Sequence, residues 1–277
     1  MQQFASTQER WMPCPALRKV AATSTKEEIM CLITLAWRPG HAQPLVVAAN
    51  RDEFYARPSA ALSQWHDAPG IYAGRDLEAG GTWLGISGDG RFAALTNIRN
   101  MQLPAGRRSR GELPANFLRT SLSARDYIET LKVSAADYSG FNLLVGDGQQ
   151  LCYFNSHSGQ AQTLSAGVYG LSNAELDSAW PKVDYAKQAL AQQLESPRPE
   201  AMLELLSDNQ VPNDNALPDT GVGIATERLL GSAFIASQTY GTRASTALIV
   251  QADGHWQMVE RSFGTLGVAL GEVSLQG

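Results

Sequence analysis

The chain has 277 residues, of which 44% are hydrophobic and 18% are charged. This composition supplies enough apolar material for a buried core and excludes a disordered chain. The formal net charge is −5, and the basic residues are scattered except for Arg107, Arg108 and Arg110, which we expect on a solvated loop. These features argue against nucleic acid or an anionic membrane as the main partner. We therefore expect a globular protein that binds a small molecule.

The spacing of cysteines and histidines, together with the hydropathy, excludes further classes of protein. Cys14, Cys31 and Cys152 form no CxxC pair, which predicts neither a disulfide framework nor a zinc site. The four histidines lack the HxH and HxxxH spacings, so we expect no bound metal. No apolar run approaches the roughly 20 residues of a membrane-spanning helix. A reducing, cytoplasmic location is expected.

The first 29 residues differ from the rest of the chain. They have no sustained apolar period and no continuous hydrophobic region of a secretory signal. A strand-like apolar run begins abruptly at Met30. We expect residues 1–29 to lie outside the fold and residues 30–277 to form a single domain. Two origins of the extension stay open, an over-long gene start or a propeptide, and in either case Cys31 would become the first residue of the mature chain.

The predicted elements run from strands to helices and back to strands. Hairpins are expected where paired apolar runs flank Gly-containing turns, at 32–37 with 45–49, 82–87 with 91–96, 141–145 with 150–154, and 246–251 with 256–263. Helices are expected at 112–122, 124–133, 180–194 and 197–206, with Ser123 as the N-cap of the second and a surface loop at 207–223. This order predicts an α+β fold, in which helices cover antiparallel sheets.

Cys31, at the start of the first predicted strand, is the residue best suited to covalent chemistry. A free cysteine is most often a small buried hydrophobe. As the first residue of a mature chain, however, its α-amino group would lie beside its own thiol. That amine titrates near ~7.7–8.0 and can act as a base close to neutral pH. Cys31 would then carry a nucleophile and its base in one residue.

Four polar residues, Asn50-Arg51-Asp52-Glu53, follow the second predicted strand. A solvated strand end would explain them in an arbitrary protein. Here the antiparallel hairpin returns the end of the second strand toward Cys31. An arginine beside a thiol favours the thiolate, and an aspartate can hold or orient an amine. Arg51 and Asp52 are therefore candidate site residues.

These residues belong to a longer ordered pattern that resembles the NRDE family, also called the transport and Golgi organisation 2 family. The match covers about residues 30–265 and leaves out residues 1–29. It rests on Cys31-Leu32-Ile33, Asn50-Arg51-Asp52-Glu53, GGTWLG at 80–85, ALTN at 94–97, Arg110-Gly111-Glu112, FNLLVGD at 141–147, LSN at 171–173, WPK at 180–182 and YGTRAST at 240–246.

The family is in turn similar to cysteine N-terminal-nucleophile hydrolases such as penicillin V acylase and bile-salt hydrolase. This resemblance implies a four-layer αββα sandwich and an amidohydrolase that cleaves a small linear amide through a thioester. It implies Cys31 as nucleophile and Arg51 and Asp52 as groups that set the thiol and the amine. The other implied site residues are Asn97 and Asn173 as oxyanion-binding and amine-holding groups, Arg243 as an arginine returning to the site, and Asn50, Glu53 and Trp83 as binding residues.

Two of these assignments have an open alternative. In the acylases the corresponding Arg and Asp are separated, whereas Arg51 and Asp52 are adjacent and would face opposite sides of a continuing strand. Of the two, we expect Asp52 to lie at Cys31. Trp83 can line a substrate cleft or simply fill the core after a tight turn.

A non-catalytic function is the alternative to hydrolysis. The resemblance also implies a ligand-handling or trafficking protein, for haem or a lipid derivative, on the same fold. No cofactor is required by the sequence. A haem protein would need an axial ligand, and near the motif only Cys31 could provide one. A structural or damage-control protein with another ligand is a third alternative, since fold does not imply function.

Overall fold

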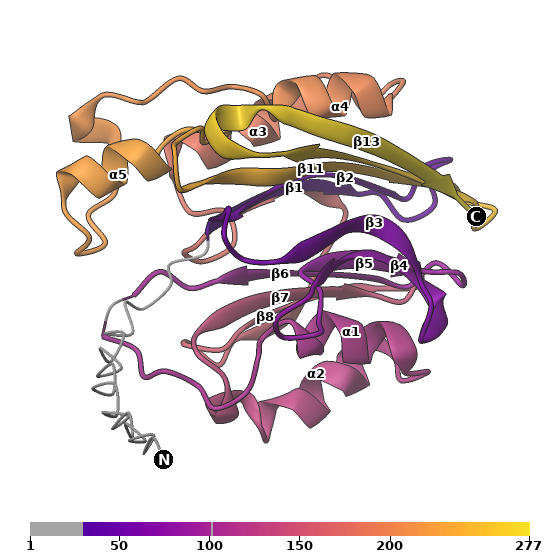
Figure 1. Ribbon diagram of the computed structural model, residues 1–277. Coiled ribbons are helices and arrows are strands. Elements are labelled where there is room, and N and C mark those ends of the chain that lie inside the picture. Colours follow the sequence, from indigo (N-terminus) through magenta and orange to yellow (C-terminus); the bar gives the residue numbers. More distant parts are fainter. Residues whose placement is uncertain (1–29, 101) are drawn as a thin grey trace, which may run out of the picture.

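The computed structural model describes residues 30–100 and 102–277, so the predicted extension 1–29 lies outside the described residues. Figure 1 shows four layers, with a six-stranded and a seven-stranded sheet stacked between two layers of helices. All neighbouring strands in both sheets are antiparallel. The predicted α+β class and four-layer αββα arrangement are confirmed.

The six-stranded sheet has the order β10-β1-β2-β11-β12-β13. Its strands are β1 (Met30–Trp37), β2 (Leu45–Phe54), β10 (Gly167–Leu171), β11 (Tyr240–Val250), β12 (Trp256–Phe263) and β13 (Ala269–Gln276). The two predicted hairpins in this sheet are present, but β2 and β11 are longer than expected. In particular, β2 continues through all four residues of the polar motif instead of ending before it.

The seven-stranded sheet has the order β3-β4-β5-β6-β7-β8-β9. Its strands are β3 (Ser59–Trp65), β4 (Ala68–Asp76), β5 (Leu84–Ser87), β6 (Phe92–Asn97), β7 (Phe141–Gly146), β8 (Leu151–Asn155) and β9 (Ala161–Thr163). The hairpins β5–β6 and β7–β8 were predicted. Strands β3 and β4 were not, because most of their residues are exposed or half-buried and they lack a strong apolar run.

Helices α1 (Glu112–Arg119) and α2 (Ala124–Lys132) cover the outer face of the seven-stranded sheet, as Figure 1 shows. Helices α3 (Pro181–Ala191), α4 (Pro199–Leu205) and α5 (Ile224–Leu230) lie on the side of the six-stranded sheet. The predicted N-cap of α2 is present, because the Ser123 side chain accepts a hydrogen bond from the Asp126 backbone N–H. Helix α5 was not predicted, because it follows the polar loop without a clear apolar period.

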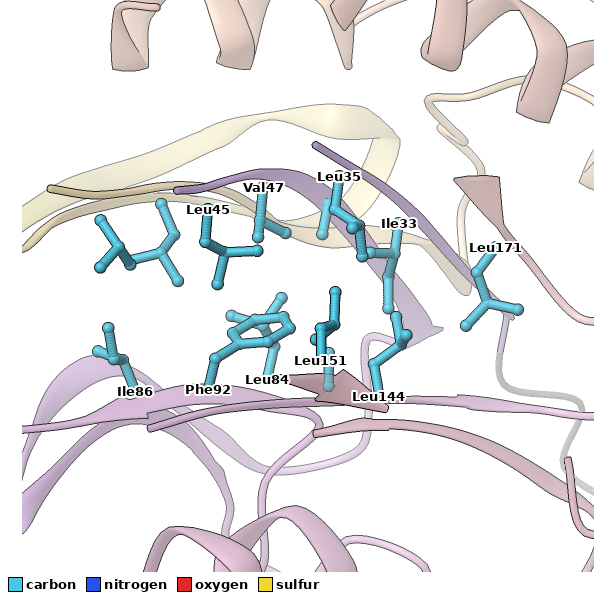
Figure 2. Packing of buried hydrophobic residues seen from close by; sticks show 14 of the residues in the cluster. Ile33, Leu35, Leu45, Val47, Leu84, Ile86, Phe92, Leu144, Leu151 and Leu171 are labelled. Carbon is cyan, nitrogen blue, oxygen red and sulfur yellow. The ribbon is translucent and has the colours of Figure 1, made fainter. Parts of the chain in front are cut away.

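Side-chain alternation in β1 and β2 divides the core into two parts. Figure 2 shows Ile33, Leu35 and Val47 projecting from the six-stranded sheet toward Leu84 and Phe92 of the other sheet. The intervening residues of β1 and β2 pack instead against the helices. Burial of each large apolar side chain contributes about 1.5–3 kcal/mol. This packing fixes which face each polar residue at the strand ends can occupy.

Candidate functional site

A cavity of about 610 Å³ opens between the two sheets at the end where β1 begins. Cys31 and Arg51 of the six-stranded sheet line it. Trp83 and Asn97 line it from the side of the seven-stranded sheet. Its volume lies within the usual range of about 300–1,000 Å³ for small-molecule sites.

Cys31, the second residue of β1, lines this cavity. The Cα partners are Cys31 with Arg51 and Met30 with Asp52. Residues opposite each other in an antiparallel pair share a face, so Arg51 lies on the face of the thiol and Asp52 on the other. This differs from our expectation for Asp52. The reason is that β2 continues to Phe54, so the alternation is not interrupted at the motif.

Asn173 connects the Cys31 backbone to the opposite sheet. Its Oδ1 accepts a hydrogen bond of 3.3 Å from the Cys31 backbone N–H. Its Nδ2 donates to the backbone oxygen of Asn97 at 2.8 Å. The neighbouring Ser172 hydroxyl donates to the Cys31 carbonyl at 2.8 Å. This geometry places Asn173 at the nitrogen of Cys31 and Asn97 at the cavity wall, and Ser172 is a site residue that we did not predict.

Asp52 lies on the helix-facing side of the sheet. Its Oδ1 accepts a hydrogen bond of 2.6 Å from the Thr242 hydroxyl. Its Oδ2 is buried and has no hydrogen-bond partner among the described residues. Burial raises the pKa of Asp52 to about 6, against the opposing effects of Lys182 and Thr242. Asp52 is thus positioned at the start of β1 behind the thiol.

Lys182 and Met30 complete this buried region. The Lys182 ammonium donates to the Leu230 carbonyl at 2.9 Å, and burial lowers the pKa of Lys182 to about 8 although Asp52 opposes this shift. Met30 is fully buried, and its backbone N–H donates to the Tyr240 hydroxyl at 2.8 Å. Lys182 belongs to the WPK segment, but no sequence pattern predicted its position near Asp52.

The thiol of Cys31 is protonated at neutral pH while Met30 precedes it. Burial raises the pKa of Cys31 to about 12, and the charge of Asp52 adds to the rise. Arg51 and a hydrogen bond from the Asp52 backbone act in the opposite direction. Since the thiolate is the reactive form, Cys31 has little nucleophilic character in this arrangement.

Glu53 supports two arginines of the cavity wall. It is fully buried, and its Oε2 lies 3.3 Å from Nη2 of Arg51 and 3.6 Å from Nε of Arg57. Arg57 also pairs with Asp76 at 2.8 Å. Glu53 therefore positions the arginines, while Arg57 is a cavity residue that we did not predict.

Arg243 returns to the cavity, as the resemblance implied, and holds part of its wall together. Its Nη1 donates to the backbone oxygens of Phe54 at 2.9 Å and Arg57 at 3.0 Å, and Nη2 donates to the Ser59 hydroxyl at 3.0 Å. A register shift between Thr242 and Ala244 accompanies this residue. Arg243 thus fixes the chain segment that connects β2 to β3.

Asn50 lies away from the cavity, among the helix-facing residues. Its Nδ2 donates to the carbonyls of Leu206 at 2.9 Å and Ala233 at 2.8 Å, and its Oδ1 accepts from the Ser245 hydroxyl at 2.6 Å. The geometry gives Asn50 a structural position. Trp83 was expected either to line a substrate cleft or to fill the core, and it does both: it belongs to the central core and also lines the cavity.

The arginine group before α1 was expected to be solvated; Arg107 and Arg108 are exposed and Arg110 is half-buried. Arg108 and Arg110 line the cavity, where Arg108 pairs with Glu112 and Arg110 donates to the Gly140 carbonyl at 3.2 Å.

Within residues 30–100 and 102–277, no group of three His, Cys, Asp or Glu side chains is placed to hold a metal ion. In the same part of the chain, no helix is long and apolar enough to span a membrane.

Comparison with solved structures finds a similarity to a Caenorhabditis elegans N-acylethanolamine-hydrolyzing acid amidase ortholog. The TM-score is 0.40 at 12% sequence identity, and the match covers 73% of this chain and 98% of that chain.

Sequence comparisons find relatives that match along most of their length. A Bos taurus transport and Golgi organization protein 2 homolog is 38% identical, with 84% of this chain and 93% of that protein covered. The Homo sapiens homolog is 37% identical with the same coverage, and a Drosophila melanogaster transport and Golgi organization protein 2 is 27% identical over 79% of this chain and 86% of that protein. The family model described as transport and Golgi organisation 2 matches residues 30–265. The chain therefore belongs to the transport and Golgi organisation 2 family.

Proposed function

We propose that the protein is a cysteine amidohydrolase of the N-terminal-nucleophile type, which cleaves a small linear amide once Cys31 is the first residue of the chain. The observation that carries this proposal is the position of Cys31. Its thiol lines a cavity of about 610 Å³, and its backbone nitrogen lies 3.3 Å from Oδ1 of Asn173. Loss of Met30 would convert that nitrogen into the free α-amine that the mechanism requires.

Two acceptors are available to hold the new α-amine. Asn173 already accepts a hydrogen bond from this nitrogen. Asp52 is in register with Met30, and its buried Oδ2 has no partner among the described residues. A protonated amine beside the sulfur would also lower the pKa of the thiol, because a nearby positive charge favours the thiolate. The same group would act as base and as electrostatic activator.

The reaction would proceed in two balanced steps. The sulfur attacks the amide carbon while the thiol proton passes to the α-amine, and the C–N bond breaks as the leaving amine takes that proton. Water then attacks the thioester with the α-amine as base, which releases a carboxylic acid and restores the thiol. We assign Asn97 as the donor to the developing oxyanion, since it lines the cavity beside Cys31. One such donor contributes about 2.7–4 kcal/mol.

Intact-mass analysis of the protein purified from its native host tests the requirement for a free α-amine. We expect a mature chain that begins at Cys31. Labelling with a thiol-reactive lactone probe would then depend on Cys31, with Cys31→Ala as the negative variant and Cys152→Ala as the matched control for a second buried cysteine. A residue retained before Cys31 would exclude this mechanism, and equal labelling of Cys31→Ala would show that the thiol is not specially reactive.

The second candidate function is non-catalytic handling of a haem or lipid derivative. It is favoured by the raised pKa of Cys31, about 12, which leaves the cavity without a reactive thiolate while Met30 is retained. The names of the relatives, which refer to transport and Golgi organization, agree with such a role. For haem, Cys31 would be the axial ligand, because the described lining residues include no His or Met. Added haem should then give a Soret shift that is lost in Cys31→Ala.

We propose a cytoplasmic location, in keeping with the few, widely spaced cysteines.

A further inference from the structure

Glu260 is a buried carboxylate of the cavity that the proposed mechanism does not use. It lies on β12, where Trp256, Met258 and Glu260 alternate and therefore share the face that points to the other sheet. Only 3% of Glu260 is exposed, yet it lines the cavity. Its Oε1 accepts a hydrogen bond of 2.7 Å from the Leu62 backbone N–H. A carboxylate so deeply buried normally has a cationic partner.

Glu260 has no such partner among the described residues, which distinguishes it from the other carboxylates of the cavity. Asp76 pairs with Arg57 at 2.8 Å, and Glu272 pairs with Arg261 at 2.8 Å. The positive charge that Glu260 senses is that of Arg51, whose guanidinium lies 3.3 Å from Glu53. Burial consequently raises the pKa of Glu260 above its usual range. Thr246 also contributes a side-chain hydrogen bond to Glu260, so the partner that Glu260 lacks among the described residues is a cationic one.

A glycine keeps this carboxylate open to the cavity. Gly74 of β4 faces Glu260, and a Cβ atom at position 74 would lie 3.4 Å from Oε2 of Glu260. Gly74 also lines the cavity. A Cβ atom at position 74 would therefore stand in van der Waals contact with the oxygen that is not bonded to Leu62, and would lie 3.3 Å from the Ala60 carbonyl oxygen. Glycine leaves this space beside the carboxylate empty.

The strand order separates Glu260 from the nucleophile by a defined distance. Thr246 is in register with Ala49 on one side and with Glu260 on the other. Glu260 therefore lies three strands away from β1, on the same face as Cys31. Ala49 pairs with Ile33, so Glu260 is also offset by two residues along the strand from Cys31. With about 4.8 Å for each strand spacing and about 3.4 Å for each residue, the two backbones are on the order of 16 Å apart. Cys31 and Glu260 thus line the same cavity at well-separated positions.

We propose that Glu260 forms a subsite for a protonated amine, and that the substrate is a linear amide whose ammonium group is separated from the scissile carbonyl by a spacer that reaches from Cys31 to Glu260. The substrate class rests on the proposed function, whereas the subsite itself is defined by binding. An ammonium would donate charge-assisted hydrogen bonds to Oε2, and such bonds are about twice as strong as neutral ones. Glu260 is thus a specificity-determining residue.

Isothermal titration of the full chain carrying Cys31→Ala tests the subsite without turnover. The probes are N-acetyl-diaminooctane, its neutral analogue N-octylacetamide and the anionic acetamidooctanoate. We expect the ammonium probe to bind most tightly and to lose about tenfold or more in affinity in Glu260→Gln. The matched control is Glu272→Gln, which removes a carboxylate of the same cavity that is already paired with Arg261. This control should change the affinity less than about twofold.

A second variant keeps the test decisive if Glu260→Gln does not fold. Gly74→Ala retains the charge and places a methyl group in contact with Oε2, so it should weaken the ammonium probe and leave N-octylacetamide nearly unchanged. Equal binding of the three probes, tighter binding of the anionic probe, or no binding of the ammonium probe would overturn the proposal. Dependence on Glu260 together with an unreactive Cys31 would support the subsite and contradict the hydrolase. A reactive Cys31 without that dependence would do the reverse.

Discussion

The polar motif Asn50-Arg51-Asp52-Glu53 places its side chains on both faces of β2, and the two faces have different contacts. On the cavity face, Arg51 lies beside Cys31 and is held by Glu53 at 3.3 Å. On the helix face, Asn50 donates to the carbonyls of Leu206 and Ala233 and accepts from Ser245 of β11, and Asp52 accepts from Thr242. The strand alternation therefore divides four consecutive residues into a pair at the candidate site and a pair that anchors the layer behind it.

This division shows that a polar motif at a strand end need not converge on one point. Both pairs are buried, so burial alone does not identify the chemical pair. The cavity does, because Arg51 lines it while Asn50 contacts only groups on the helix side. Asp52 belongs to the anchoring face by its side chain, and it reaches the candidate site only through the backbone nitrogen at the start of β1. Changes on the two faces should therefore have separable effects.

The largest expected effect concerns the reactivity of the cavity face. A pKa of about 12 for Cys31, three units above the ordinary value of 9.0, means about a thousandfold less thiolate at neutral pH. Iodoacetamide should therefore label Cys31 in the full chain about a thousandfold more slowly than an unstructured cysteine peptide, with a rate that still rises with pH above 9. Peptide-resolved mass spectrometry measures this rate, with Cys31→Ala as the blank. Rapid labelling of the full chain at neutral pH would contradict the structure.

The next largest effect concerns the anchoring face. Asn50→Ala would remove three buried hydrogen bonds and leave the carbonyls of Leu206 and Ala233 without that donor. We expect the free energy of unfolding to fall by roughly 3–4 kcal/mol, since each bond contributes about 1 kcal/mol and each buried unsatisfied group costs more. Urea denaturation of the full chain measures this. Ser134→Ala, which removes one long hydrogen bond of 3.4 Å, is the control. A loss below about 1 kcal/mol would mean that Asn50 does not anchor the helix layer.

Local sequence patterns predicted most of the hairpins and helices around β2, because turn residues and apolar periods can be recognised within short segments of the chain. Strands β3 and β4 were missed, since their residues are mostly exposed or half-buried and alternate weakly. The face of β2 that Asp52 occupies could not be predicted, because the length of β2 depends on its pairing with β11, which lies far away in the chain. That pairing extends order past the last apolar residue of the strand.

The candidate site shows the same limit. Cys31, Arg51, Asn97 and Arg243 were found from the motif and the resemblance, and the structure places them at one cavity. Arg57 and Glu260 were not found, because their role depends on which strands become neighbours. For Glu260 a signal was available, since it continues the alternating series of Trp256 and Met258 that marks the core face of β12. An acidic residue at a position where the alternation predicts a core residue indicates a candidate binding site, and such a position can be found from the sequence.

A smaller effect links the anchoring face to pH. The pKa of Asp52 is about 6 in the folded chain and 3.8 in the unfolded reference, so folding favours the protonated carboxyl. The associated stability is present below pH 3.8 and is lost as the pH rises through 6, with a limit of about 3 kcal/mol. Asp52→Asn keeps an oxygen acceptor for Thr242 and should lack this component. Urea denaturation between pH 4 and 7 measures it, and parallel profiles for the two proteins would contradict the raised pKa.

The smallest effect on stability should come from Arg51, and it would complete the contrast between the faces. Arg51→Gln removes one of two guanidinium groups near Glu53 and leaves Arg57 at 3.6 Å, so we expect a loss of about 1 kcal/mol. The labelling rate of Cys31 should nevertheless fall several-fold, because Arg51 lowers the pKa of the thiol. Asn50→Ala should show the opposite balance, with a large loss of stability and, in the fraction still folded, an unchanged thiol. If both variants changed stability and labelling together, the two faces would act as one unit, and the division of the motif would have no functional meaning.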